Sequence, residues 1–392
     1  MKRHFGGRGA GIALLTIWGL LMVGCRGSSS TETDLREETA LLGELLFFDA
    51  SLSEPAGQSC ASCHDPAVAF TDPDSGTPTS EGVIPGRFGL RNTPQVSYAS
   101  FSPEFHFDAG QGLWTGGQFL DGRAPTLEEQ AKQPFLNPLE MNNPDPATLV
   151  AKVRKSEYAH MFETVWGPGA LEDDQGLFDL IAVAIAAFER TELLSPFTSK
   201  YDAYLRGEAR LSEQELRGLA LFNRPDKGNC AACHPSAPDA EGRPPLFTDF
   251  SYDNLGVPRN PGNPFYENDS TVVADARERI DLGLGETVRA RLFRDGELPP
   301  GAAAPEEEDG KFKVPSLRNV AVTAPYMHNG VFTTLRQVVQ FYNTRDVDPD
   351  RWGPPEVAAT VNGDELGNLG LTEQEVDDIV AFLGTLTDGY TP

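Results

Sequence analysis

The chain has 392 residues, more than one compact domain usually holds, so two domains are expected. Its 58 acidic and 32 basic residues give a formal charge of -26, which repels nucleic-acid phosphates, so nucleic acid is not expected as a partner. Gly (39) and Pro (31) are too frequent for a long coiled coil and indicate many turns and loops.

Residues 1–24 have the pattern of a signal peptide. Three basic residues precede an apolar run over 12–23, which is too short for a comfortable membrane span. The run ends on Gly-Cys, which resembles the lipobox of bacterial lipoproteins, so cleavage before Cys25 and lipidation of Cys25 are predicted. An unprocessed helix with a buried Cys25 is the alternative. Residues 25–38 would then form a polar tether that holds the protein in the periplasm or at the cell surface.

The other four cysteines form two copies of one pattern. The copies are Cys60-Ala61-Ser62-Cys63-His64 and Cys230-Ala231-Ala232-Cys233-His234. This spacing is the attachment motif of haem c, in which two thiols bond the haem vinyl groups and the next imidazole binds the iron. His64 and His234 are therefore the predicted proximal ligands of two haems. A four-thiolate zinc site would leave both histidines unexplained, and disulfides between such close neighbours would add little stability.

Segments around the two motifs repeat. Residues 43–47 (Gly-Glu-Leu-Leu-Phe) precede the first motif and residues 218–222 (Gly-Leu-Ala-Leu-Phe) precede the second. Downstream, Leu-Arg-Asn occurs at 90–92 and again at 317–319. The repeat predicts a duplicated cytochrome c unit with one haem in each copy.

Helix signals recur along the chain. A hydroxyl residue is followed three positions later by Glu or Gln, the capping-box pattern, at Thr126/Glu129, Ser212/Glu215, Thr334/Gln337 and Thr372/Glu375. Apolar residues at helical spacing form two faces, Leu177, Ile181, Ile185 and Phe188 in the first and Val376, Ile379, Val380 and Leu383 in the second. Ser-Pro at 195–196 follows the first face and marks the expected domain boundary.

Long alternating strand patterns are absent, and 298–309 and 346–366 have the composition of solvated loops. The predicted fold is therefore all-α, with long loops. It consists of two cytochrome c-like domains, 39–196 and 197–392, each holding one covalent haem c.

Five further segments carry distinctive motifs: 90–94, 121–131, 137–141, 314–319 and 324–330. Together they resemble the bacterial di-haem cytochrome c peroxidase family, which includes MauG, over about Leu41 to Leu386. The resemblance implies that peroxide reacts at the N-terminal haem and that electrons enter by the C-terminal haem.

The resemblance also assigns residues to the N-terminal haem pocket. Gln130 and Glu140 match the distal glutamine and glutamate of the family. A carboxylate near the iron can move a proton between the two oxygens of peroxide, so Glu140 is the predicted acid/base. Classical peroxidases often have a blocking His upstream of the first Arg-Asn pair, and residues 65–91 contain none. Either this iron is open, which is the preferred interpretation, or His106 caps it.

The sixth ligand of the C-terminal haem is predicted in the same way. Fourteen residues after His328, where the peroxidases use Met, this chain has Tyr342, as in MauG. A phenol oxygen donates more electron density than a thioether and would stabilise oxidised iron. Tyr342 is the predicted ligand, and Met327 is its rival.

The resemblance further implies a calcium ion between the domains. Its protein ligands would be the side chain of Asn92 and the backbone carbonyls of Thr323 and Pro325, oxygen donors that suit a hard cation.

Two arginines and one replacement complete the predicted site. Arg91 and Arg123 carry the charge that could neutralise haem propionates. In the family a Trp usually precedes Asp-Gly-Arg and lies between the haems, but this chain has Leu120 there. Trp114 is six residues away and is expected to serve packing instead.

The leading hypothesis is a lipid-anchored di-haem c peroxidase that reduces hydrogen peroxide to water. Its electrons would come from a small redox protein, a cytochrome c or cupredoxin, and the acidic surface favours a donor with a basic patch. The second hypothesis is a MauG-like oxidase that modifies residues of a partner protein, favoured by Tyr342 and by the missing blocking His. The third is a non-catalytic di-haem electron carrier. A homodimer is implied by analogy alone.

Overall fold

The computed structural model describes residues 28–391, so the predicted signal peptide and Cys25 lie outside the described residues. Twelve α-helices occur in the described part: α1 (Ser28–Phe48), α2 (Cys60–Cys63), α3 (Leu127–Leu136), α4 (Pro146–Val153), α5 (Ala159–Trp166), α6 (Asp174–Glu189), α7 (Lys200–Leu205), α8 (Glu213–Asn223), α9 (Leu284–Asp295), α10 (Leu335–Thr344), α11 (Pro349–Trp352) and α12 (Glu373–Gly384). The 3-10 helices in the same range are η1 (Ala50–Leu52), η2 (Pro66–Val68), η3 (Ala99–Phe101), η4 (Cys230–Ala232), η5 (Pro264–Glu267), η6 (Ala276–Glu278), η7 (Pro305–Glu308) and η8 (Val320–Val322).

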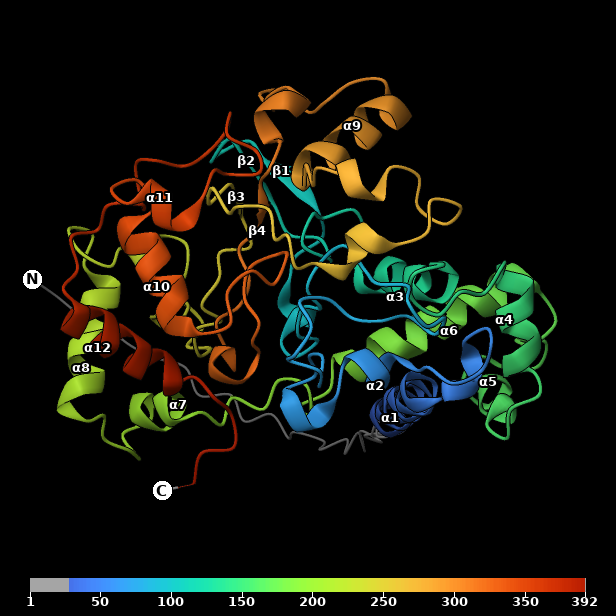
Figure 1. The fold of residues 1–392 in the computed structure, drawn as a ribbon. Helices are drawn as coiled ribbons and strands as arrows, with labels where there is room; N and C mark the ends of the chain where they lie inside the picture. Colours follow the sequence, from blue (N-terminus) through green and yellow to red (C-terminus); the bar gives the residue numbers. More distant parts are fainter. Residues whose placement is uncertain (1–27, 392) are drawn as a thin grey trace, which may run out of the picture.

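The helices gather at two sides of the molecule. Figure 1 shows α1 to α6 on one side and α7, α8, α10 and α12 on the other, with the strands and long connections between them. The largest hydrophobic clusters follow this division, since one uses buried residues from 42 to 194 and the other uses buried residues from 201 to 386. Among the described residues, no helix combines the length and the apolar character needed to cross a membrane.

Two small antiparallel strand pairs interrupt the helical fold, although an all-α chain is predicted. β1 (His106–Asp108) pairs with β2 (Leu113–Thr115), so that His106 lies opposite Thr115. β3 (Tyr252–Asp253) pairs with β4 (Phe312–Lys313). Strands of two or three residues are too short to produce an alternating pattern, which is why the sequence does not indicate them.

The predicted helix starts and buried faces are mostly confirmed. Ser212, Thr334 and Thr372 each form a complete capping box, and the apolar faces of α6 and α12 are buried. Thr126 accepts a hydrogen bond from the Glu129 backbone, but the Glu129 side chain pairs with Lys132 instead of returning to the cap.

The two predicted loops are more ordered than expected. Residues 298–309 contain η7, and the Glu308 side chain there is buried and accepts a bond from Lys311. Residues 346–366 contain α11, and the side chain of Glu356 in this stretch is only 6% exposed. Both short helices begin with a proline, whose fixed φ suits the first helical turn, so composition alone misjudged them.

The same helix crossing occurs in both halves of the chain. α1 crosses α6 at Gly43, where a Cβ would collide with the carbonyl oxygen of Ala184. α8 crosses α12 at Gly218, where a Cβ would collide with the carbonyl oxygen of Asp378. The two glycines occupy matching positions of the repeated segments and let each helix pair approach closely.

Gly218→Ala is therefore expected to destabilise the fold by about 1–3 kcal/mol, because the added methyl forces α8 away from α12. Denaturant unfolding of the haem-loaded protein measures this. Gly384→Ala is the matched control, since Gly384 ends α12 and a Cβ there meets nothing within 4 Å. The control should be neutral or slightly stabilising, and equal stability of the two variants would contradict the close crossing.

Candidate active site

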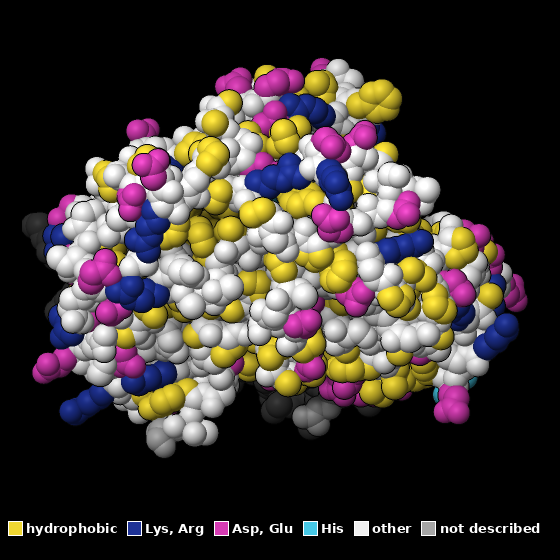
Figure 2. Space-filling view, viewed as in Figure 1, with side chains coloured by type: hydrophobic (Ala, Val, Ile, Leu, Met, Phe, Trp, Pro, Cys, Tyr) yellow, Lys and Arg dark blue, Asp and Glu magenta, His cyan; other side chains and the backbone are white. Residues whose placement is uncertain are grey.

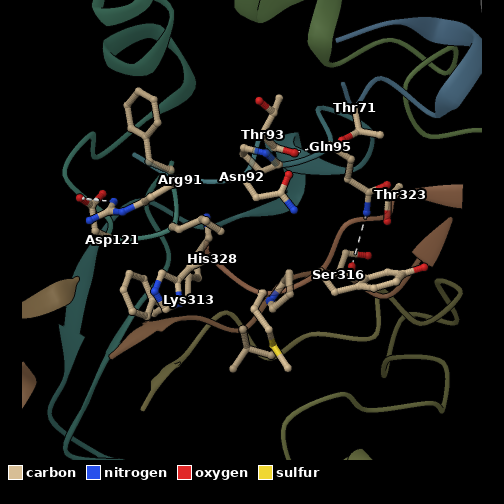
Figure 3. Close-up of a pocket in the computed structure, with 18 of the residues that line it drawn as sticks. Thr71, Arg91, Asn92, Thr93, Gln95, Asp121, Lys313, Ser316, Thr323 and His328 are labelled. Atoms are coloured by element: carbon tan, nitrogen blue, oxygen red, sulfur yellow. Dashed lines mark hydrogen bonds and ion pairs between the residues drawn. The ribbon is translucent and has the colours of Figure 1, made fainter. Parts of the chain in front are cut away.

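Both Cys-x-x-Cys-His motifs open into one cavity of about 700 Å³. Its central walls come from chain segments far apart in the sequence. Figure 3 shows Asn92, Thr93 and Gln95 from the first half of the chain facing Ser316, Thr323 and His328 from the second half. The Gln95 amide donates to the Ser316 carbonyl oxygen across this gap at 3.4 Å. The site is thus shared by both halves of the chain.

The two motif histidines are held in the orientation of metal ligands. His64 Nδ1 lies 3.1 Å from the carbonyl oxygen of Phe70, and His234 Nδ1 lies 2.7 Å from that of Phe247. A proton on Nδ1 satisfies each carbonyl and leaves the Nε2 lone pair free. Burial lowers the pKa of His64 to about 4 and also lowers the pKa of His234, so both rings are neutral near pH 7, as iron ligation requires.

The four motif cysteines line the cavity, and no disulfide joins them. Burial raises the pKa of each thiol to about 12. No group of three or more His, Cys, Asp or Glu side chains within the described residues is arranged to hold a metal ion. Paired thiols beside a free imidazole and a large cavity fit a covalently attached haem at each motif.

The predicted distal residues both line this cavity. Gln130 comes from α3, and Glu140 comes from the turn that follows α3. Asn137 Nδ2 donates to Glu140 Oε1 at 2.6 Å, which fixes the carboxyl group. Burial raises the pKa of Glu140, and the charge of Arg123 and the Asn137 bond oppose that shift. Such a carboxyl can exchange a proton closer to neutral pH than a solvated glutamate can.

His106 does not reach the cavity. It is exposed at the start of β1, with Nδ1 2.8 Å from the carbonyl oxygen of Glu104. Among the described residues, the histidines that line the cavity are His64, His234 and His328. The arrangement favours the open interpretation of the N-terminal iron site over a cap by His106.

Both candidate ligands of the C-terminal haem line the cavity. Tyr342 comes from α10, and Met327 comes from the segment before it. Burial is the main cause of the raised pKa of Tyr342, and the neighbouring Cys230 and Cys233 raise it further. The phenol therefore lies close to the second haem motif, while the choice between the two ligands stays a prediction.

Arg91 is held by two carboxylates. Its Nη1 lies 2.6 Å from Asp121 Oδ2, and its Nε lies 2.6 Å from Asp281 Oδ2. Figure 3 shows Arg91 and Asp121 side by side at the cavity. Burial opposes ionisation of both acids, but Arg91 more than offsets it and holds their pKa values below the usual range. Arg123 lies 3.1 Å from Asp121 and over the ring of Phe119. Pairing of these arginines with propionates stays a prediction.

Lys313 is a half-buried cation of the cavity wall that the sequence reasoning missed. Its Nζ donates to the carbonyl oxygen of Gly117 at 2.6 Å, and burial lowers its pKa to about 8. Its backbone N–H donates to the carbonyl oxygen of Leu120, the residue that replaces the usual Trp. The available signal was a single Lys within the apolar run Phe312 to Pro315.

Trp114 does not replace the missing aromatic residue in the cavity. Its ring stacks on Phe105 with centroids 4.9 Å apart and planes 5° from parallel. It belongs to a hydrophobic cluster with Tyr252, Leu284 and Val288, outside the cavity lining. Its predicted packing role agrees with this position.

The residues of the predicted calcium site lie near one another. The Asn92 side-chain amide contacts the carbonyl oxygen of Pro325, and its backbone N–H donates to the carbonyl oxygen of His328 at 2.7 Å. Thr323 lies two residues before Pro325 and lines the same cavity. The oxygen donors suit calcium, and the ion itself stays a prediction.

Glu189 is a second acid that the sequence reasoning missed. It is the last residue of α6, is 5% exposed and lines the cavity. A signal was present in the repeat: Ala-Phe-Glu-Arg-Thr at 187–191 matches Ala-Phe-Leu-Gly-Thr at 381–385. A charged residue thus stands where the second half of the chain has Leu383.

Comparison with known proteins agrees with this geometry. A family model described as di-haem cytochrome c peroxidase matches residues 37–210. The methylamine utilization protein MauG of Paracoccus denitrificans (strain Pd 1222) is 42% identical over 94% of this chain and 93% of that protein. The cytochrome-c peroxidase IdrP1 of Pseudomonas sp. (strain SCT) is 31% identical over 89% of this chain and 81% of that protein.

A solved structure is similar over most of the chain. The crystal structure of the diheme peroxidase BthA from Burkholderia thailandensis matches with a TM-score of 0.78 and 39% identity, covering 90% of this chain and 86% of that chain. The sequence motifs, the shared cavity and these relatives lead to one conclusion. The chain belongs to the di-haem cytochrome c peroxidase family of oxidoreductases, whose members carry two haems c.

Proposed function

We propose that this enzyme reduces hydrogen peroxide to water at the N-terminal haem, with electrons that arrive through the C-terminal haem. The observation that carries the proposal is the wall next to the first motif, where Gln130 and Glu140 line the cavity and His106 stays outside it. Peroxide plus two electrons and two protons gives two waters, so the site needs groups that deliver protons as well as an electron path.

The residues of the chain have separate tasks in this reaction. Haem iron with an open coordination position binds and splits peroxide. His64 would hold the iron, and Cys60 and Cys63 would attach the haem covalently within the cavity. Glu140, oriented by the Asn137 amide, takes a proton from one peroxide oxygen and returns it to the other.

Two measurements on the haem-loaded protein test the proposal. The diferric spectrum should show a high-spin haem, and peroxide consumption should need a reduced cytochrome c or cupredoxin. A protein whose haems are both low-spin in every redox state would instead be the electron carrier considered above.

A MauG-like oxidase is the second candidate, and Tyr342 is the observation that favours it. A phenol beside the second motif would stabilise oxidised iron, which suits oxidation of a partner protein. This function predicts that peroxide-treated protein modifies a partner's residues without consuming an external reductant. Rapid peroxide turnover with a reduced donor and no protein modification would exclude it.

Tyr342→Phe tests the ligand directly. Loss of the phenol oxygen should change the electron paramagnetic resonance signal of the C-terminal haem, because an axial ligand sets the electronic state of the iron. Met327→Leu is the matched variant from the same cavity wall and should leave the signal unchanged. The reverse result, a change in Met327→Leu alone, would assign the ligand to Met327.

Calcium is proposed at Asn92, Thr323 and Pro325. Metal analysis of the purified protein should find about one calcium per chain, and Asn92→Ala should lower the calcium content, since it removes the side-chain ligand. Asn142→Ala, which removes an amide on another loop, serves as the control. Calcium-free native protein with unchanged activity would contradict this assignment.

The proposed setting is the periplasm or the cell surface, with lipid on Cys25. The predicted tether 25–38 is wrong over 28–38, because these residues belong to helix α1 (Ser28–Phe48). The charge of -26 favours a small donor protein with a basic patch, and salt should slow that encounter. Figure 2 shows acidic and basic side chains interspersed on one face, so that face offers no patch of a single sign. Cytochrome c, a cupredoxin and a second copy of the chain remain the proposed partners.

A further inference from the structure

The carboxyl group of Glu189 lies at the edge of the first haem motif. Glu189 ends α6, and its position on that helix faces the cavity together with Ile185, one turn earlier. The preceding residue, Phe188, packs on Phe47 of α1 with ring centroids 5.2 Å apart. Glu189 and Glu140 both raise the pKa of the Cys60 thiol, which places both carboxyls near the first haem attachment point.

Glu189 is 5% exposed, and its carboxyl group faces the cavity without an ion-pair partner. Within residues 28–391, no hydrogen bond or ion pair reaches its side chain. The adjacent cation, Arg190, is engaged elsewhere, because its Nη1 lies 2.7 Å from Glu128 Oε1. Burial raises the pKa of Glu189 to about 8, Arg190 opposes the shift and Glu128 adds to it. An unpaired carboxyl in such a place changes its protonation when the local charge changes.

Few other charged groups face Glu189. α3 contributes Glu128, the end of α6 contributes Arg190, and α2 contributes the Cys60 thiol. α1, which packs closely on α6, presents the apolar residue Phe47 here, while Glu44 is exposed. The described surroundings thus provide a weakly compensated, apolar site for one carboxyl group.

The second half of the chain shows that the fold does not need a charge here. Gly43 meets Ala184 in the first helix crossing, and Gly218 meets Asp378 in the second. Glu189 lies five residues after Ala184, and Leu383 lies five residues after Asp378, so the two residues occupy equivalent positions. Leu383 is 6% exposed and lines the cavity, as Glu189 does. The same backbone position therefore carries a leucine at one haem motif and an acid at the other.

We propose that Glu189 is a redox-linked proton acceptor of the N-terminal haem site. When that site gains one electron, the Glu189 carboxylate binds one proton from solvent, and when the site loses the electron the carboxylic acid releases the proton. The physical reason is charge compensation, since an added negative charge in a buried, low-dielectric site favours the neutral acid. Glu189 does not touch peroxide in this scheme; the proton it binds compensates the negative charge that the electron adds to the site.

The proposal rests on the haem site of the proposed function but not on peroxide turnover. Its test is a redox titration of the haem-loaded protein without peroxide, with each haem followed separately by its spectrum. In the native protein the reduction potential of the N-terminal haem should fall as pH rises. The slope of this fall should correspond to at most one proton taken up per electron. The fall should be steepest within about two pH units of the raised carboxyl pKa of about 8.

Two neutral variants and one reciprocal variant make the test specific. Glu189→Gln, which keeps the shape, and Glu189→Leu, which copies Leu383, should both remove this pH dependence and leave the C-terminal haem unchanged. Leu383→Glu should introduce a new pH dependence at the C-terminal haem. Glu129→Gln, an exposed acid on α3, is the control and should behave as the native protein does.

The outcomes separate clearly. A native slope that persists in Glu189→Gln would overturn the proposal. If the Glu189 variants fail to take up haem, Leu383→Glu provides the test. A reduction potential of the C-terminal haem that does not change with pH in this variant would overturn the proposal. A protein that consumes no peroxide but shows the predicted slopes would refute the proposed function and leave this inference intact.

Discussion

Replacing Glu140 by Gln should lower peroxide turnover by about 10²–10⁴-fold, the usual contribution of a general acid–base group. The amide keeps the shape of the side chain but cannot accept the proton that must leave one peroxide oxygen. Haem content and the spectrum of the C-terminal haem should not change, because the Glu140 carboxyl lies near Cys60 and Cys63 of the first motif. Steady-state peroxide consumption with a reduced donor measures the effect.

The pH profile distinguishes proton transfer from a structural effect. Burial raises the pKa of Glu140, so the carboxylate form needed to accept a proton is lost at a higher pH than for a solvated glutamate. Turnover by the native enzyme should therefore fall as the pH drops through this raised pKa, and Glu140→Gln should lack that limb. Glu140→Asp should recover part of the rate. Glu129→Gln, which changes an exposed acid of α3, serves as the control, and an active Glu140→Gln enzyme would exclude the assigned role.

Arg318→Met should destabilise the protein by about 3–5 kcal/mol, the cost of leaving a buried charge unpaired. Arg318 and Asp202 form a two-bond ion pair, with Nη1 2.9 Å from Oδ2 and Nη2 2.8 Å from Oδ1. Their side chains are 1% and 0% exposed. Arg318 Nε also donates to the carbonyl oxygen of Pro245 at 2.9 Å. Denaturant unfolding of the haem-loaded protein near pH 7 measures the loss.

The stabilisation that the Arg318–Asp202 ion pair provides should depend on pH in the acid range. Burial raises the pKa of Asp202, but Arg318 and the Ser199 bonds more than offset it, so the folded-state pKa is lowered. The pair's stabilisation is present above the unfolded-state pKa of about 4 and is lost as the pH falls through the lower folded-state pKa. Arg318→Met should lose this acid-dependent component.

An exposed ion pair provides the comparison. Arg206 and Glu208 lie 2.7 Å apart with side chains 48% and 56% exposed. Arg206→Met should change stability by less than about 1 kcal/mol, because water and salt screen that pair. Equal losses in Arg318→Met and Arg206→Met would show that burial of the pair does not matter.

The repeated Leu-Arg-Asn segment shows how far the sequence could lead. The segment occurs once in each half of the chain, but it does not predict which acids pair with its arginines. Arg318 pairs with Asp202 from α7, and Arg91 pairs with Asp121 and Asp281, the second of which is 190 positions away. Which acid meets which arginine depends on how distant segments pack, and no local pattern contains that information.

The amino-acid sequence by itself determined the cofactor class and most of the helix starts. Haem attachment depends on two thiols three positions apart, and a helix start depends on a hydroxyl residue and an acid or amide three positions later, so short stretches of sequence suffice. Only the tertiary structure decided that His106 stays at the surface and that Lys313 and Glu189 face the haem cavity. Burial of a charge is set by contacts between segments that are far apart in the chain, and the local sequence around a residue does not fix those contacts.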